Sequence, residues 1–228
     1  MLTNSFNRAN AFGRQQSLIL FTGDFVLTGG TKSPLGGASG SASHPPSGWT
    51  ALISASVDDN FTSATIPAFT INGTDYTTAF IGSNTYFTFG SGSNVYNPLS
   101  ASSPALPKIF LGSADHSYQR VSSLISTYYT RIRYEGTNGT SGTPGNPNIV
   151  FEATFFDKTK TGNLPVVEVL FGTHGSSGSL SVAAGIASSS NYYARFVPTD
   201  NQSFVFVGNL TGTRWSIYRG YYISGAGY

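Results

Sequence analysis

The chain has 228 residues, and only 12 Lys or Arg and 10 Asp or Glu carry formal charge. This charged fraction of 10% is far below the roughly 25% of an ordinary soluble domain. Ser, Thr, Asn and Gly together fill 99 positions, so hydroxyl and amide groups must form most of the solvent-exposed surface. With 39% hydrophobic residues and a net charge of +2, the chain lies outside the composition of disordered proteins and can form a core.

Several classes of protein are excluded at once. The chain has no cysteine, which excludes a disulfide scaffold and any Cys-ligated metal. It has no run of Lys or Arg, so we expect no nucleic-acid partner. No apolar stretch approaches the ~20 residues of a membrane span, so no membrane insertion is expected. The apolar run near the start comes late and is interrupted by Gly23 and Asp24, so we expect no signal peptide and synthesis in the cytoplasm.

Short alternating runs rich in β-branched and aromatic residues recur along the chain between clusters of Gly, Asn, Ser and Pro. This pattern predicts an all-β protein, an antiparallel β-sandwich or jelly roll. The expected strands are residues 17–27, 49–56, 65–71, 76–81, 85–89, 107–112, 129–135, 149–156, 165–171, 179–186, 192–197, 203–208 and 214–223.

In two of these strands, the residue pattern also predicts which faces are buried. In 129–135, apolar and aromatic side chains alternate with Arg131, Arg133 and Glu135, so we expect one buried face and one wet face. Residues 149–156 carry bulky side chains on both faces. They therefore predict a central strand that is covered on both sides.

Three segments lack any periodicity. Residues 28–48 contain six Gly, five Ser and three Pro and predict an extended arm or linker. We therefore divide the chain into an N-terminal strand and arm, residues 1–48, and a sandwich domain, residues 49–228. The arm is expected to become ordered only in an assembly, so limited proteolysis of the isolated protein should remove it.

The other two segments, residues 136–148 and 172–178, predict surface loops. The first contains only Gly, Thr, Asn, Ser and Pro and is expected to join two strong strands as a long hairpin loop.

Residues for nucleophilic catalysis are scarce. The three histidines are His44 in the arm, His116 in the run ADHSY, and His174 in a Gly-rich segment. The run Asp115-His116-Ser117 suggests a triad, but adjacent strand residues face opposite ways and no G-x-S-x-G elbow is present. The favoured interpretation of this run is a polar turn, and no catalytic residue is assigned.

Two carboxylates could serve a glycosidase. Glu135 and Glu152 flank the 136–148 loop and could face each other on paired strands, as glycoside hydrolysis requires. Arg131 and Arg133 lie on the same face as Glu135, so cross-strand ion pairs explain the same residues without catalysis. The ion-pair interpretation is favoured.

No cofactor or metal is expected. Asp58-Asp59-Asn60 offers oxygen ligands, but it lacks the spaced acidic residues and the Gly of a calcium loop. A solvated turn is the favoured interpretation.

Surface binding is the remaining possibility, because Tyr and Trp provide large, rigid contacts with a polar group. Cross-strand packing on a half-exposed sheet is the competing and favoured explanation for most of the tyrosines. The surface or interface candidates are Asn138, Asn146, Tyr192, Tyr193 and Trp215.

Two stretches carry a resemblance. NGTDYTTAFIGSNTYFTFGSGSNVY at 72–96 and RIRYEGTNGTSGTPGNPNIVFEATF at 131–155 resemble a module of structural and tail-fibre-type virion proteins of tailed bacteriophages. The first stretch also looks like the strand-turn-strand of nidogen-like extracellular β-sandwiches. The resemblance covers about residues 57–171. It implies a virion context and an architecture, and it transfers no catalytic residue.

The expected function is therefore a non-enzymatic structural component of a tailed-phage virion, in the tail or fibre attachment apparatus. The alternatives are a capsid decoration (cement) protein and a glycan-binding or glycan-depolymerising β-sandwich. The expected partners are other virion proteins, further copies of the chain in a homo-oligomer with a trimer favoured, and a host surface glycan.

Overall fold

The structure, a computed structural model, describes residues 24–28, 47–95, 104–112, 116–138, 149–174, 184–188, 191–198 and 203–223. These residues form fourteen strands and one short 3-10 helix, η1 (Lys158–Lys160). The strands are β1 (Asp24–Thr28), β2 (Thr50–Ile53), β3 (Phe61–Ile71), β4 (Thr74–Gly82), β5 (Tyr86–Phe89), β6 (Lys108–Leu111), β7 (His116–Ile125), β8 (Tyr129–Asn138), β9 (Ile149–Phe156), β10 (Val166–His174), β11 (Ala184–Ala187), β12 (Tyr192–Phe196), β13 (Ser203–Gly208) and β14 (Trp215–Ile223).

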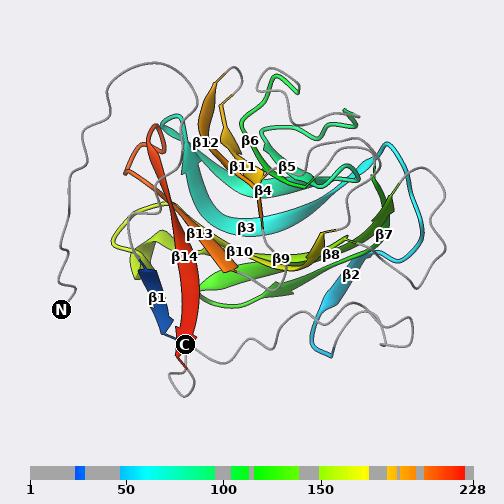
Figure 1. Ribbon diagram of the computed structural model, residues 1–228, viewed down its shortest axis with the longest axis horizontal. Coiled ribbons are helices and arrows are strands. Elements are labelled where there is room, and N and C mark those ends of the chain that lie inside the picture. Colours follow the sequence, from blue (N-terminus) through cyan, green and yellow to red (C-terminus); the bar gives the residue numbers. More distant parts are fainter. Residues whose placement is uncertain are drawn as a thin grey trace.

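The strands form two sheets that pack face to face (Figure 1). The larger sheet has eight strands in the order β1-β14-β13-β10-β9-β8-β7-β2, and the smaller has six in the order β12-β11-β6-β5-β4-β3. Every pairing is antiparallel except that of β1 with β14, which is parallel. The expected all-β antiparallel sandwich is confirmed.

The core lies between the two sheets and is rich in phenylalanine. Phe69 of β3 stacks on Phe89 of β5 at 5.3 Å between ring centroids, and meets Phe155 of β9 edge to face at 5.2 Å. Tyr134 of β8 stacks on Phe151 of β9 at 4.8 Å. Such aromatic pairs contribute about 0.5–1.5 kcal/mol each beyond the area that they bury.

The structure contains one strand that the sequence pattern did not predict, β7. Its core side chains, Tyr118 and Val121, are three residues apart, because the pairing of β7 with β8 shifts register between Tyr118 and Arg120. A bulge inserts an extra residue and breaks the period of two on which strand prediction rests. The expectation of a polar turn at His116 and Ser117 is therefore wrong, since both residues belong to β7.

Other strands differ from the expected ranges at their ends. β3 starts at Phe61 and contains Pro67, which lies at a register shift in an edge strand, a position where proline is tolerated. β8 extends through 136–138 and β10 through 172–174, so both expected loops begin later than predicted. Residues 139–148 and 175–183 lie outside the described part of the chain.

The burial of two predicted strands can now be compared with expectation. All eight residues of β9 are buried, which confirms a central strand covered on both faces. The expected wet face of 129–135 is only partly confirmed, because Arg131 and Arg133 are half-buried and Glu135 is buried.

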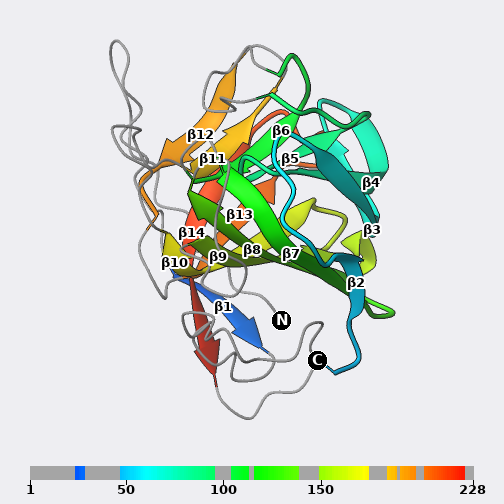
Figure 2. The ribbon, with the colours of Figure 1, turned by 90° about the vertical axis from the view of Figure 1, so that its right-hand side faces the viewer.

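The two edges of the larger sheet are formed by β1 and β2, the first two strands among the described residues. β1 lies beside β14 at one edge, and β2 lies beside β7 at the other (Figure 2). Residues 24–28 of the predicted N-terminal segment are thus part of the sheet, whereas 1–23 and 29–46 lie outside the described residues.

Candidate functional site

All three glutamates of the chain lie on one face of the eight-stranded sheet. Glu135, Glu152 and Glu168 belong to the adjacent strands β8, β9 and β10. Each alternates with side chains of the core, such as Tyr134 and Phe151, and therefore points away from the six-stranded sheet. We call this face, turned away from the six-stranded sheet, the outer face.

These carboxylates are held by arginines and a hydroxyl. Glu135 accepts a hydrogen bond from Arg133 Nε at 2.8 Å and lies 3.9 Å from Arg120 Nη1. Ser203 Oγ donates to Glu168 Oε1 at 2.8 Å.

Glu152 takes part in a cross-strand pair. Its Oε1 lies 3.8 Å from Nε of Arg131, which belongs to the neighbouring strand β8. The predicted cross-strand ion pair is therefore present. Glu135 and Glu152 are only 5% and 6% exposed, so these glutamates form a network of buried ion pairs on the outer face.

The second polar cluster is built around the turn between β4 and β5, residues 83–85, which lies within the sequence motif at 72–96. The turn is completely buried, and Thr85 has a positive φ of 61°. Asn84 Oδ1 accepts the backbone N–H of His116 at 2.7 Å, and its Nδ2 lies 3.2 Å from both Asp59 Oδ1 and the Val95 carbonyl. A small polar turn here thus ties together three distant segments of the chain.

Two tyrosines of the eight-stranded sheet reach across to the same turn. Tyr134 Oη donates to the Ser83 carbonyl, and Tyr118 Oη donates to the Ile81 carbonyl. Burial raises the pKa of both phenols above the ordinary value, so both stay protonated and able to donate. The motif residues at 81–84 are therefore structural, and join the two sheets at one end of the sandwich.

His116 is completely buried at the start of β7. Its Nδ1 lies 3.2 Å from the Thr137 carbonyl, and burial lowers its pKa to about 4. The imidazole is neutral at pH 7 and packed inside the fold, which disfavours a role as a solvent-accessible general base. His174 is the last residue of β10, while His44 and Asp115 lie outside the described residues.

The Asp58-Asp59-Asn60 segment forms a turn that is stabilised by its own side chains. The backbone N–H of Asp59 donates to Asp58 Oδ1 at 3.0 Å, and that of Phe61 donates to Asn60 Oδ1 at 2.7 Å. Asp59 has a positive φ of 43°. Within the described ranges, no three His, Asp or Glu side chains come together as a metal-binding group.

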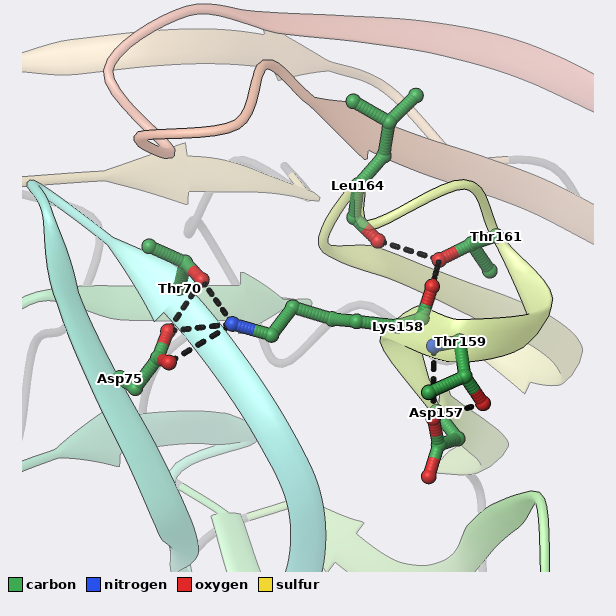
Figure 3. A network of polar contacts seen from close by, with 7 residues as sticks. All are labelled: Thr70, Asp75, Asp157, Lys158, Thr159, Thr161 and Leu164. Carbon is green, nitrogen blue, oxygen red and sulfur yellow. Dashed lines mark hydrogen bonds and ion pairs between the residues drawn. The ribbon is translucent and has the colours of Figure 1, made fainter.

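The third polar cluster, formed by Thr70, Asp75 and Lys158, has no signal in the sequence. Lys158 of η1 reaches the β3–β4 hairpin, where its Nζ lies 2.7 and 2.8 Å from the two carboxylate oxygens of Asp75 and 3.0 Å from Thr70 Oγ1 (Figure 3). Thr70 Oγ1 in turn donates to Asp75 Oδ1. Hydrogen bonds from Lys158 and Thr70 hold the pKa of Asp75 below its ordinary value.

This cluster contains a hydroxyl, an amine and a carboxylate, the groups of an activated nucleophile. The Thr70 hydroxyl is 4% exposed and is committed both as donor and as acceptor. The cluster therefore has a structural role. It joins η1, which follows β9 of the eight-stranded sheet in the chain, to the β3–β4 hairpin of the six-stranded sheet.

The hairpin tip is also held by the loop between β13 and β14. The backbone N–H of Gly73 donates to the Thr211 carbonyl at 2.6 Å, and that of Asn72 donates to the Gly212 carbonyl at 3.2 Å. Gly212 has a positive φ of 61°, and a Cβ there would lie 2.2 Å from the Thr70 carbonyl oxygen. Only glycine fits this close approach.

Lys108 of β6 is the one lysine that the described residues bury completely. Burial lowers its pKa to about 8. The other three residues of its strand, KIFL, are apolar, and this sequence pattern indicates that the lysine is buried with them.

The surface candidates occupy different environments. Tyr192 is exposed at 39%, and its ring meets Phe110 edge to face and lies 5.6 Å from the Arg195 guanidinium. Tyr193 is half-buried, packs against the core and donates its hydroxyl to Asn72.

Trp215 is also half-buried. Its ring lies 5.5 Å from that of Phe69, and its Nε1 donates to the Gly212 carbonyl at 2.9 Å. Asn138 ends β8 opposite His116, and Asn146 lies outside the described residues. Of the candidates whose side chains the structure describes, Tyr193 and Trp215 bond Asn72 and Gly212, which contact each other, whereas Tyr192 lies beside Phe110.

No family model matches the chain, and neither the curated proteins nor the solved structures include a match. Within the part of the chain that the structure describes, no helix is long and apolar enough to cross a membrane.

Proposed function

We propose that this chain is a non-enzymatic structural component of a tailed-phage virion, in the tail or fibre attachment apparatus. The observation that carries the proposal is the double motif at 72–96 and 131–155, which resembles a module of such virion proteins. The two halves of the motif meet in the fold through the Tyr134–Ser83 hydrogen bond and the contact of Phe87 with Phe151. The residues of the motif thus contribute to the packing of the two sheets, which supports a structural role.

The use of the ionisable groups also supports a non-enzymatic role. Glu135 and Glu152 are buried in ion pairs on the outer face, and Asp75 is paired with Lys158. A glycosidase needs its two carboxylates ~5–10 Å apart with room for the sugar between them. Carboxylates that are already neutralised by arginine serve packing better than acid-base chemistry.

Electron microscopy of virions tests the proposal directly. Antibodies against the chain, coupled to gold, are applied to purified particles made from the genome that encodes it. We expect gold at the tail or its fibres. Particles that lack the chain by mass spectrometry would contradict the proposal.

Capsid decoration is the first alternative, and the same labelling distinguishes it because gold would then cover the head. A decoration protein would also bind expanded capsids stoichiometrically and raise their thermal stability. Tail placement predicts neither effect.

A homo-oligomer, with a trimer favoured, follows from the symmetry of virion parts. Light scattering of the purified chain at high concentration measures its mass. A monomer at every concentration would contradict this part of the proposal.

The second alternative is a glycan-binding or glycan-depolymerising sandwich. The parent protein and the Glu152→Gln variant are incubated with capsular polysaccharide and exopolysaccharide, and the release of reducing ends is measured. We expect no release by either protein. Release by the parent that the variant loses would replace our proposal with the depolymerase.

A further inference from the structure

The turn between β7 and β8 presents a tyrosine to solvent. Of the tyrosines whose burial the structure describes, only Tyr128 and Tyr192 are exposed, and Tyr128 is 44% exposed. The hydroxyl of Tyr128 forms no hydrogen bond with the described residues. Ile125, at the end of β7, is 64% exposed beside the same turn. An aromatic ring, an apolar side chain and a polar hydroxyl are therefore open to a ligand at this turn.

Backbone hydrogen bonds fix the position of this turn. The N–H of Ser126 donates to the Tyr129 carbonyl at 2.9 Å, and the N–H of Asp157 donates to the Tyr128 carbonyl at 2.8 Å. The second bond ties the turn to Asp157, the N-cap residue of η1. An aromatic side chain on a backbone that is already ordered loses little conformational entropy when it binds a ligand.

Lys160 of η1 places a positive charge beside the exposed ring. Its Nζ lies 4.0 Å from the centre of the Tyr128 ring, within the range of a cation–π contact. Lys158 of the same helix is paired with Asp75. Lys160, by contrast, forms no ion pair with the residues that the structure describes. Its ammonium group is therefore able to pair with a negative charge on a ligand.

The carboxylate that is nearest to Lys160 in the sequence has another role. Asp157 Oδ1 accepts the backbone N–H of Thr159 at 2.7 Å and its hydroxyl at 2.6 Å (Figure 3). These two bonds cap η1. The carboxylate thus stabilises the short helix, and Lys160 remains the unpaired charge beside Tyr128.

These groups fit a sugar better than a protein partner. A sugar ring has C–H groups that can pack on an aromatic ring and hydroxyls that can bond to a phenol, and a carboxylate on the sugar would pair with the ammonium group. A protein partner ordinarily contacts about 20–30 residues on each side. The groups at this turn and η1 form a cluster that matches a few sugar units.

We propose that Tyr128 and Lys160 form a binding site for a glycan that carries carboxylate groups, such as a polysaccharide of uronic acids. Tyr128 packs against a sugar ring, and Lys160 pairs with the carboxylate. The use of this site for attachment to a host surface rests on the function proposed above, whereas the site itself rests on the exposure and contacts of these two residues.

NMR titration of the ¹⁵N-labelled full-length chain tests the site. The probes are the tetramers of galacturonate and of mannuronate, with maltotetraose as a neutral sugar and inorganic tetraphosphate as an anion without a sugar ring. We expect the uronate tetramers to shift the amide signals of residues 125–129 and 158–163, and the other two probes to leave these signals unchanged. No shift of these signals with either uronate, or equal shifts with maltotetraose or tetraphosphate, would overturn the proposal.

Variants assign the binding to the two side chains. Tyr128→Ala and Lys160→Gln should each weaken the binding of the uronate tetramer that binds the parent by about tenfold. The matched controls, Tyr192→Ala and Arg195→Gln, alter another exposed tyrosine with a cation beside it, whose ring already meets Phe110. The controls should bind as the parent does, and a normally dispersed spectrum shows that each variant is folded. Unchanged affinity of Tyr128→Ala, or an equal loss in the controls, would overturn the proposal.

The gold labelling of virions gives a separate result. Uronate binding at Tyr128 by a chain that is absent from the particles would support this site and contradict the virion role. Gold at the tail, together with no uronate binding, would support the virion role and overturn this site.

Discussion

The backbone N–H of His116 donates a hydrogen bond to the side-chain oxygen of Asn84, 2.7 Å away and 32 residues earlier in the chain. The bond attaches the first residue of β7, in the eight-stranded sheet, to the β4–β5 turn of the six-stranded sheet. Because Asn84 is fully buried and also binds Asp59 and Val95, its removal would leave several polar groups without partners.

We therefore expect Asn84→Ala to lower the free energy of unfolding by about 3 kcal/mol. Asn84→Asp should also destabilise the protein at pH 7, because it replaces an amide donor beside Asp59 by a second carboxylate. Urea denaturation followed by circular dichroism measures both. Asn94→Ala, at an exposed residue, is the control and should change stability by less than about 0.5 kcal/mol. Equal stability of Asn84→Ala and the control would contradict the role of this turn.

His116 should make the fold sensitive to mild acid. Its pKa is about 4 in the folded chain and about 6.5 in an unfolded one, so between these values the unfolded state binds the extra proton. The contribution of His116 to the free energy of unfolding is then constant above pH 6.5, and it falls by roughly 3 kcal/mol as the pH drops to 4. Unfolding of the wild type and of His116→Gln should be compared at pH 7 and pH 4.5. The variant should lose less stability between these pH values, and an identical loss would contradict the prediction.

The buried charge of Lys108 should lower the free energy of unfolding at neutral pH. Its pKa of about 8 in the folded chain lies below the ordinary value of about 10.4, so a buried charge is maintained at pH 7. We expect Lys108→Met to stabilise the protein at pH 7 by about 2 kcal/mol, since the replacement has a similar length and no charge. The gain should shrink as the pH rises above 8, where the wild-type amine loses its proton while the unfolded chain keeps it. Thermal unfolding at pH 7 and pH 9 measures the difference, and an unchanged or larger gain at pH 9 would argue against this explanation.

The pair formed by Asp75 and Lys158 should contribute modestly, because Asp75 is half-exposed. A double-mutant cycle with Asp75→Asn and Lys158→Met should give a coupling energy of about 0.5–1 kcal/mol. The coupling should decrease in high salt, which screens charges that are open to solvent. Thr70→Val, which removes only the buried hydroxyl between them, should cost about 1 kcal/mol. A coupling energy of zero at low salt would show that η1 is held by packing alone.

The fold class could be predicted from the sequence because most strands keep a period of two. Residues Ile81, Phe87 and Phe89 were in phase in the sequence and all three are buried in the core. β7 could not be predicted in this way, because its bulge places Tyr118 and Val121 out of phase.

The polar clusters were predicted less completely. The ion pair between Arg131 and Glu152 followed from alternation on neighbouring strands, which is a local property. Lys158 lies 83 residues from Asp75, and only the packing of the two sheets brings them together. No periodicity in the sequence encodes such a contact.

The parallel pairing of β1 with β14 has a consequence for synthesis. A ribosome makes residues 24–28 early, but Arg219 and Gly220, which pair with Asp24 and Phe25, follow only after almost the whole sandwich has emerged. The edge of the larger sheet at β14 therefore closes late, and any contact that distant in sequence forms slowly. During translation, residues 24–28 therefore lack their partner strand until β14 has been synthesised.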